Sequence, residues 1–451
     1  MIRNLGLGVL MSAGLAACPL AASAKPESGV SITVTPEAGR AMARQALQVG
    51  NPALTVSIAS QLLAANPADV GSMMLLTAGL SRSGHPAQAV GTGHKAFAFS
   101  TTTAQRFEAA YLTAEALSAA DRPYGAKLWL RHADNFTHNE AEKGLLSGAF
   151  QKLDARTPLK LNLSFGGGPT DNVNGGSLHD SFDFFGLQLP IAQALPGTIL
   201  YSTAQLSYRL VARPRFAASL YAIGAQRNVW LSPRGHALQP GARNGDYRYD
   251  SLDLGGSVAW AGSGQTSYSL DLRVGQTWQG GDRQTDHERL VFGLTGKLSA
   301  TRLAHVEMTA EQTHYPATPH ANSLRLAADA SLTQAFGKAS LRYSVGVSHV
   351  ASEAAGVAYR AVSTGVEWTP AQEFHGITLG VFGRVEVRHY WKTPALKPDI
   401  LTQAGVMGQF NNLSFYGFSP SVTLSISRSM SQVVVRDTAN IGLTVGIVSA
   451  F

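Results

Sequence analysis

The stretch Asn440-Ile441-Gly442-Leu443-Thr444-Val445-Gly446-Ile447-Val448 decides the fold of this chain. Apolar residues alternate in it with small or polar ones, which is the two-residue period of a β-strand. Four apolar residues share one face with the terminal Phe451: Ile441, Leu443, Val445 and Ile447. About fourteen such segments fill residues 156–451, and this repetition is typical of a transmembrane β-barrel. The sequence predicts a fourteen-stranded antiparallel barrel, with a soluble β-sandwich as the alternative.

The expected connections between these segments alternate in length. Tight turns are predicted at sites such as 212–215 and 337–338, and longer loops at sites such as 280–287. This gives about seven longer loops and six tight turns, as in bacterial barrels with periplasmic turns and external loops. Both ends of the barrel, including Phe451 as its carboxyl-terminal signal, are therefore expected on the periplasmic side of an outer membrane.

Charged residues of both signs occupy the strand face opposite the apolar one. A charge that faces lipid is costly, so these residues are expected to line a water-filled lumen or to pair across it. The expected lumenal charges are Asp271, Arg273, Glu307, Glu311, Arg325, Arg342, Glu367, Arg384, Glu386 and Arg388.

A long insertion over residues 168–197 follows the first predicted strand. It is unusually apolar for an external loop, and its candidate contact residues are Phe182, Phe184, Phe185 and Leu187. Such a segment could fold into the lumen as a plug, cover the barrel as a lid, or contact a partner. The sequence leaves these alternatives open.

The amino terminus has the features of an export signal. Arg3 supplies a basic region, residues 5–15 form an apolar core, and Ala22-Ser23-Ala24 is a cleavage sequence, so residues 1–24 are predicted to be a signal peptide. The residues before Cys18 also resemble a lipoprotein signal, in which Cys18 would be acylated. A barrel needs no lipid anchor, which favours cleavage after Ala24 and a mature chain without cysteine.

Residues 25–155 are rich in Ala and Leu at helical spacing. Thr35-Pro36-Glu37 predicts a helix start. Pro52 and Pro86 lie 34 residues apart at equivalent helix–turn–helix positions, and a third turn is predicted at Asp121-Arg122-Pro123. This period is that of tetratricopeptide repeats, which stack into a curved solenoid that binds peptides or proteins. We expect a periplasmic domain of this type, with a generic helical bundle as the alternative.

Charge and motif content argue against several function classes. The net charge of +7 is spread along the chain without blocks of Lys or Arg, so no nucleic-acid partner is expected. The chain contains no G-x-S-x-G, H-E-x-x-H, P-loop or paired-cysteine motif. We therefore expect no catalytic residue, metal or cofactor, and no enzyme. Asp286, His287 and His320 could mimic an enzymatic rim site, but ordinary strand ends have the same composition.

The junction between the two predicted domains carries Leu161-Asn162-Leu163-Ser164-Phe165-Gly166-Gly167-Gly168-Pro169-Thr170-Asp171-Asn172-Val173-Asn174. This segment resembles the opening strand of the surface lipoprotein assembly modifier (Slam) family, in which an Asp/Ser-Asn-x-Asn turn follows a glycine-bearing strand. The turn residues here are Asp171, Asn172 and Asn174. The layout is similar too: a signal peptide, periplasmic tetratricopeptide repeats and a fourteen-strand barrel. The helical domain departs from the family in being short, at about three repeats.

The resemblance implies export of a protein across the outer membrane. In this family the periplasmic repeats receive a client, often a lipoprotein, and the barrel helps to deliver it to the surface. The three turn residues would then shape a loop and have no catalytic role. The expected partners are outer-membrane lipids, the exported client and the barrel-assembly machinery. An exopolysaccharide-export porin and a general porin are the alternatives; the mixed lumenal charges disfavour the first, and the helical domain is unexplained by the second.

Overall fold

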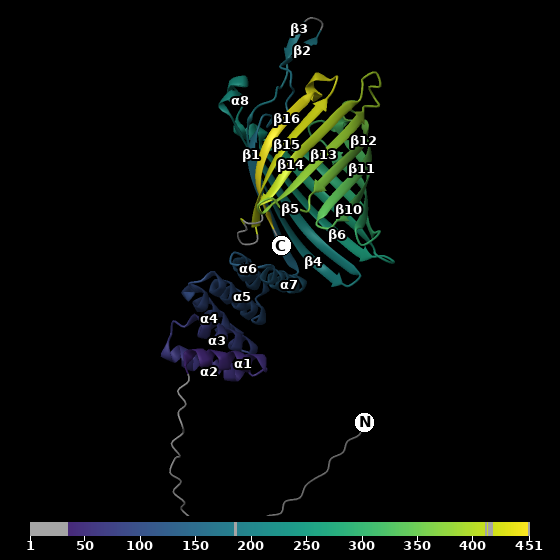
Figure 1. Cartoon of the computed structure of the whole chain (residues 1–451). Helices are drawn as coiled ribbons and strands as arrows, with labels where there is room; N and C mark the ends of the chain where they lie inside the picture. The colour runs from purple at the N-terminus through teal and green to yellow at the C-terminus, as the bar shows by residue number, and fades with distance from the viewer. Residues whose placement is uncertain (1–34, 185–186, 411–412, 414–417, 450–451) are drawn as a thin grey trace, which may run out of the picture.

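The computed structural model describes residues 35–184, 187–410, 413 and 418–449. Figure 1 shows a stack of helices next to one end of a closed β-barrel, with α6 and α7 nearest to the barrel. We call this end of the barrel the near end and the opposite one the far end. The expected signal peptide, Phe185 and Phe451 lie outside the described residues.

Over residues 35–156 of the described chain, three consecutive helix pairs and a seventh helix form the predicted solenoid of tetratricopeptide type. The helices are α1 (Pro36–Gln48), α2 (Pro52–Ala65), α3 (Val70–Arg82), α4 (Pro86–Phe99), α5 (Thr103–Ala119), α6 (Pro123–Asp134) and α7 (Glu140–Arg156). The second helix of each pair begins at a proline, at the turns that the sequence predicted. Among the described residues, no helix has both the length and the apolar composition needed to cross a bilayer.

Local sequence explains where these helices begin. The Thr35 hydroxyl accepts a hydrogen bond from the Ala38 amide at 3.3 Å, and Pro36 fills the first helical position. Thr102 and Gln105 form a capping box at the start of α5. These side chains satisfy amide groups that have no partner within the helix.

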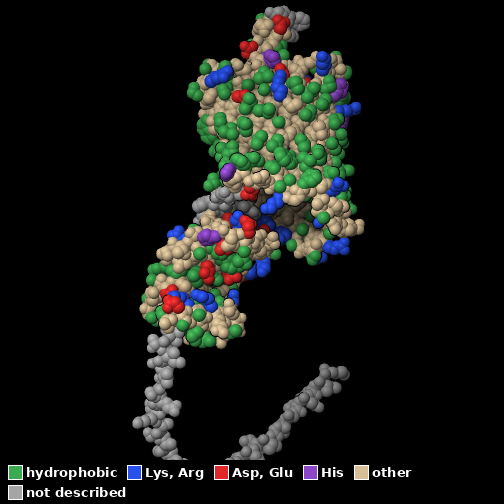
Figure 2. All heavy atoms as spheres, viewed as in Figure 1, with side chains coloured by type: hydrophobic (Ala, Val, Ile, Leu, Met, Phe, Trp, Pro, Cys, Tyr) green, Lys and Arg blue, Asp and Glu red, His purple; other side chains and the backbone are tan. Residues whose placement is uncertain are grey.

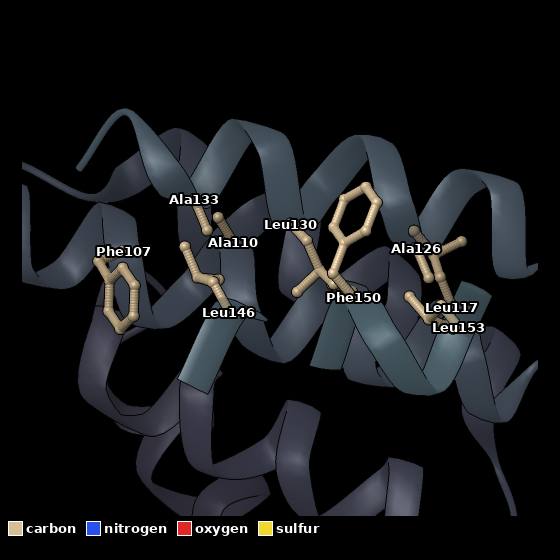
Figure 3. Close-up of a cluster of buried hydrophobic side chains, with 10 residues drawn as sticks. Phe107, Ala110, Leu117, Ala126, Leu130, Ala133, Leu146, Phe150 and Leu153 are labelled. Atoms are coloured by element: carbon tan, nitrogen blue, oxygen red, sulfur yellow. The ribbon is translucent and has the colours of Figure 1, made fainter. Parts of the chain in front are cut away.

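Small residues let the helices approach closely. Ala43, Ala59 and Ala109 are fully buried, and Gly93 of α4 lies so near α5 that an added Cβ would be 2.4 Å from the Thr113 hydroxyl. The largest cluster of buried apolar side chains joins α5, α6 and α7 (Figure 3). Leu130 is a nearly fully buried member of it. Burying one such large apolar side chain contributes about 1.5–3 kcal/mol, so this cluster fixes α7 onto the stack.

The barrel has fourteen antiparallel strands. They are β1 (Leu159–Thr170), β4 (Gly197–Arg213), β5 (Phe216–Leu231), β6 (Tyr249–Ala261), β7 (Thr266–Gln279), β8 (Asp282–Lys297), β9 (Arg302–His314), β10 (Ser323–Phe336), β11 (Ala339–Ser352), β12 (Tyr359–Thr369), β13 (Ile377–His389), β14 (Asp399–Phe410), β15 (Phe418–Met430) and β16 (Thr438–Ser449). Neighbours along the barrel pair in order, and β1 closes the cylinder against β16, with Phe165 opposite Ile447. The predicted barrel is confirmed.

The barrel carries its apolar side chains on the outside. Leu272, Val345 and Val362 are 57%, 59% and 61% exposed although they lie in strand interiors. On the face of the cylinder in view, Figure 2 shows hydrophobic side chains as a broad green belt, with charged side chains above and below it. So large an apolar surface is stable in lipid and not in water. The cylinder is therefore a transmembrane β-barrel.

One predicted loop is wrong. The sequence pattern predicted a long connection over residues 280–287, but only Gly280 and Gly281 separate β7 from β8. Both glycines have positive φ, 62° and 96°, which glycine adopts without steric cost in a tight hairpin. The ladder continues to the pair Gln279 and Asp282. Polar strand ends that project beyond the apolar belt have the composition of a loop, which explains the error.

The longest connections lie at the far end (Figure 1). The connection between β1 and β4 contains the hairpin β2 (Ser181–Phe184) and β3 (Leu187–Pro190), and the next long one contains α8 (Pro233–Leu238) and the 3-10 turn η1 (Asn244–Tyr247). Shorter 3-10 turns are η2 (Pro319–Ala321) and η4 (Val434–Arg436).

Candidate functional site

The helical domain is joined to the barrel at the end of α7. From β4, the Arg209 guanidinium donates hydrogen bonds from Nη2 to the carbonyl oxygens of Asp154, Ala155 and Thr157 at 2.9, 2.9 and 3.1 Å. The last carbonyls of a helix have no intrahelical partner and carry partial negative charge. Arg209 therefore caps α7 from the barrel wall, and we call this contact the joint.

Further contacts strengthen the joint. The Asp154 carboxylate pairs with Lys127 Nζ of α6 at 2.5 Å and with Lys160 Nζ of β1 at 2.9 Å. Burial raises the pKa of Asp154, but the hydrogen bonds from the two lysines outweigh it, so this pKa lies below its ordinary value. The Arg131 guanidinium of α6 lies 4.8 Å from the ring centre of Phe418 in β15, within cation–π range. Helices α6 and α7 are thus both held to the barrel.

A groove of about 590 Å³ lies between α5 and α7, on the part of the solenoid that the joint holds. Its floor includes Leu130 and Leu153, which are buried, and Leu145 at its edge is 55% exposed. Gly144 and Gly148 line the groove one turn apart on α7, and a Cβ added to either would meet no atom within 4 Å. We call this feature the α5–α7 groove.

Polar side chains line the same groove beside its apolar floor. They are Tyr111, Glu115, Ser118, Lys152 and Arg156. Burial raises the pKa of Glu115, and the nearby Arg82, Tyr111 hydroxyl and Lys152 offset this only in part. Arg156 donates to the Ser118 hydroxyl at 3.1 Å. An apolar floor with charged groups of both signs can accept the side chains of a peptide while hydrogen-bonding its polar groups.

All ten charges expected in the lumen alternate along their strands with exposed apolar residues, and therefore point to the interior of the barrel. Most have a neighbouring partner of opposite charge. The pairs of opposite charge are Arg273–Asp271 at 3.7 Å, Arg289–Glu311 at 2.6 Å, Arg342–Glu367 at 3.7 Å, Arg384–Glu386 at 3.3 Å and Arg388–Glu386 at 2.5 Å. The His305 imidazole lies 3.8 Å from the Glu307 carboxylate. Arg325 lines a cavity of about 150 Å³ with Asp329 and Arg384. The wall presents paired charges instead of a field of one sign.

The residues considered for a rim enzyme site are not brought together. His287 faces the lumen and its Nε2 lies 2.7 Å from Asp253 Oδ1, whereas the neighbouring Asp286 pairs with Arg283. His320 lies in η2. Within the described ranges, no three His, Cys, Asp or Glu side chains are grouped closely enough to hold a metal ion.

Asp171, Asn172 and Asn174 hold the base of the far-end insertion. An Asp171 carboxylate oxygen accepts from the Ile441 amide at 2.7 Å, and the Asn172 side-chain amide donates to the Gly176 and Ala439 carbonyls, both at 2.9 Å. Asn174 bridges the two arms of the insertion through the Gln193 carbonyl and the Leu195 amide, both at 2.9 Å. These side chains shape turns and fix the insertion to β16.

The insertion ends in a hairpin that is apolar on one face. Phe182 is opposite Leu189, and directly paired residues share a face of the sheet. The backbone register also pairs Phe184 with Leu187. Figure 1 shows β2 and β3 standing above the far end of the barrel, outside the cylinder. The hairpin does not fill the lumen in this structure. Phe185, at its tip, is not described.

Two features escaped the sequence analysis. Arg209 is one of many arginines on a predicted lumenal face, and nothing in the sequence links it to α7. The α5–α7 groove had a signal that could have been used: Gly144 and Gly148 are spaced one helical turn apart in a region predicted to be helical, where glycine is unfavourable.

Comparison with known proteins gives no family. No protein-family model matches the chain, and no curated protein matches it in sequence. The TPR2B domain of yeast Sti1 in its pHsp70 complex is similar at 15% identity over 27% of this chain and 97% of that one, with a TM-score of 0.25. A bacterial polysaccharide outer membrane secretin (7% identity, 64% and 98% covered, TM-score 0.35) and an anion-selective porin from Comamonas acidovorans (9%, 65% and 100%, 0.38) match the barrel region.

These likenesses are too distant to transfer a function. The class is defined by the fold itself: a transmembrane β-barrel of the outer-membrane type, preceded by a helical solenoid of tetratricopeptide type that is joined to its near end.

Proposed function

We propose that this protein exports a client protein across the outer membrane and displays it at the cell surface. In this proposal the near end faces the periplasm, the helical domain binds the client, and the far end is exposed outside the cell. The single observation that carries the proposal is the link between groove and barrel: the α5–α7 groove is built on α7, and Arg209 of the barrel caps that same helix. A segment bound there is held at the near end of the barrel.

Other features agree with this role. Figure 2 shows the near end of the barrel hollowed beside the helical domain, with Lys and Arg side chains around the hollow. The turn residues Asp171, Asn172 and Asn174 form the structural turn that the resemblance to the Slam family implies. On that resemblance, the client is a protein such as a lipoprotein, and the barrel-assembly machinery and outer-membrane lipids are further partners.

A passive pore explains less of the molecule. Diffusion through a porin needs no helical domain. A porin would therefore also need none of the joint contacts that hold this domain to the barrel. An exopolysaccharide-export porin is expected to present one charge sign to its polymer, whereas the lumenal charges here are paired. Protein export accounts for both the groove and the joint.

The test uses two matched glycine variants in cells that lack the native gene. Gly148→Leu places a side chain into the α5–α7 groove, whereas Gly91→Leu places the same side chain at an equally open position of α4 that does not line the groove. Surface proteins are compared by protease shaving, secreted polysaccharide is compared by gel, and the amount of folded barrel is measured in the outer membrane.

We expect deletion to remove one or a few surface proteins with unchanged polysaccharide. Native protein and the Gly91→Leu variant should restore them, while Gly148→Leu should not, at equal amounts of folded barrel. Loss of polysaccharide with an unchanged surface proteome would overturn the proposal in favour of polysaccharide export. Full restoration by Gly148→Leu would show that the groove does not bind the client.

A further inference from the structure

The lipid-facing surface of the barrel has a hollow of about 790 Å³ across β8 to β12. It is formed because Ala310 and Ala328, which are small, lie between larger side chains. These larger outward-facing neighbours are Leu290, Phe292, Met308, Leu326, Val347 and Val362. The hollow is almost entirely apolar, and it lies on the belt that contacts acyl chains. We call it the outer hollow.

A cluster of cationic and aromatic side chains borders the outer hollow toward the far end. His349 and Arg360 line the hollow itself, and they share the outward face of their strands with Val347 and Val362. Arg360 Nε lies 3.4 Å from His349 Nδ1. The Trp391 ring stacks on His349 with centres 6.1 Å apart, and Lys392 Nζ lies 5.4 Å from the Trp391 ring centre. The four side chains form one continuous group, the rim cluster.

Among the residues that the structure describes, no acidic side chain neutralises the cations of the rim cluster. In the described part of the chain, neither Arg360 nor Lys392 pairs with a carboxylate; the Lys392 ammonium donates instead to the main-chain carbonyl of Glu353 at 3.0 Å. Other arginines at the far end behave differently, since Arg283 pairs with Asp286 and Arg436 with Asp399. The positive charge of the rim cluster is therefore available to an external anion.

The residue types of the rim cluster indicate where it lies relative to the membrane. An arginine on the lipid face costs free energy at mid-membrane and little near the interface, and Trp is typical of the interface. Arg360 and Trp391 therefore mark the level at which lipid headgroups lie. An anion at this level, directly above an apolar hollow, is most simply the headgroup of a lipid whose acyl chain occupies the hollow.

We propose that the rim cluster and outer hollow together bind a phosphorylated, multiply acylated glycolipid of the outer leaflet. Arginine and lysine bind phosphate through charge-assisted hydrogen bonds, which are stronger than neutral ones. The two cations are Arg360 of β12 and Lys392 of the loop after β13, so they can contact more than one phosphate of a wide headgroup. The outer hollow accepts one acyl chain of the same molecule. This site is separate from the α5–α7 groove and from the lumen.

The experiment uses the full-length protein, purified in detergent, with lipid A as the probe and retention measured by native mass spectrometry. Removing charge-assisted hydrogen bonds in Arg360→Gln with Lys392→Gln should weaken lipid A binding by about tenfold or more. Ala328→Phe, which fills the outer hollow without removing a charge, should also weaken it. Arg283→Gln is the matched control, because it removes a far-end arginine that already has a carboxylate partner.

Each outcome decides the proposal. Lipid A binding that falls in the rim and hollow variants but not in Arg283→Gln supports it. Equal loss in Arg283→Gln would indicate unspecific attraction to a basic surface and would overturn the proposal. Competition by millimolar inorganic phosphate as effective as that by lipid A would identify a free-anion site instead of a lipid site. Equal or stronger retention of phosphatidylglycerol would contradict the glycolipid assignment.

Discussion

The helical domain and the barrel use apolar side chains in opposite ways. In the helical domain, Leu130 is 2% exposed and packs among other helices. In the barrel, Leu272 is 57% exposed and charges such as Arg289 and Glu311 face inward. The difference teaches that each half of the chain is folded for its own surroundings. The first half buries its apolar side chains away from water, and the second turns them toward lipid and lines its interior with charges.

The largest expected effect is a cavity in the helical core. Leu130→Ala should destabilise the helical domain by about 2–5 kcal/mol, because the removed atoms leave a void that the packed helices cannot close. Leu272→Ala should cost much less, under about 1 kcal/mol, because lipid fills the space that the side chain leaves. Thermal loss of helical circular dichroism and urea unfolding of the barrel in lipid measure the two effects. Equal destabilisation by Leu130→Ala and Leu272→Ala would contradict the proposed difference between the helical domain and the barrel.

A charge introduced at an exposed apolar position should destabilise the barrel much more than the helical domain. Val345→Arg, at the middle of β11 on its outward face, should destabilise the barrel by about 2–4 kcal/mol, because an arginine there must face hydrocarbon. Val49→Arg, at an exposed position after α1, should change stability by no more than about 0.5 kcal/mol. Barrel stability is measured by urea titration in vesicles. A neutral Val345→Arg would contradict the lipid-facing assignment.

The joint should contribute less than either core. Arg209→Ala removes the cap on α7 and should weaken the attachment by about 1.5–3 kcal/mol, the usual range for hydrogen bonds to a charged group. Hydrogen exchange at the end of α7 in the full-length protein should become faster. Arg213→Ala, at an exposed turn position of the same strand, is the control. Unchanged exchange in Arg209→Ala would show that the two halves are held together elsewhere.

The smallest effect concerns the pH dependence of the helical domain. The folded state raises the pKa of Glu115 above its ordinary 4.5, so the folded state favours the protonated acid. Below pH 4.5 the Glu115 carboxyl is protonated in both the folded and the unfolded state, and its burial then costs no ionisation energy. As the pH rises through the higher folded-state pKa, the buried carboxyl must ionise and the free energy of unfolding falls. Glu115→Gln should therefore unfold at a higher temperature than the native protein at pH 7, with a smaller difference at pH 4. A difference that does not change with pH would contradict burial as the cause.

The barrel could be predicted because each strand carries its own two-residue period. The alternation of apolar and polar residues, as around Leu443 and Val445, can be read within one strand. Fourteen such strands with an apolar outer face are compatible with few folds other than a transmembrane barrel. The loop expected over 280–287 failed for a related reason. Past the membrane, both faces of a strand meet water, so Arg283 and Asp286 lose the alternation although the ladder continues.

The candidate site was less predictable. Asp171, Asn172 and Asn174 were recognised as turn residues, but their partners, such as the Ile441 amide, lie about 270 positions away in the chain. The rim cluster likewise joins Arg360 of β12 to His349 of β11 and to a loop after β13. Contacts of this kind depend on strand register, which sequence alternation alone does not give.

The sequence by itself determined a helical repeat followed by a lipid-exposed barrel, because hydrophobic periodicity and proline positions act within a few residues of each other. Only the tertiary structure decided that Arg209 caps α7 and that Gly144 and Gly148 line a groove beside the barrel. It also decided that cations without an acidic partner in the described part of the chain border an apolar hollow. The physical reason is that burial, ion pairing and capping act through space, and closure of the barrel brings together residues from distant parts of the chain.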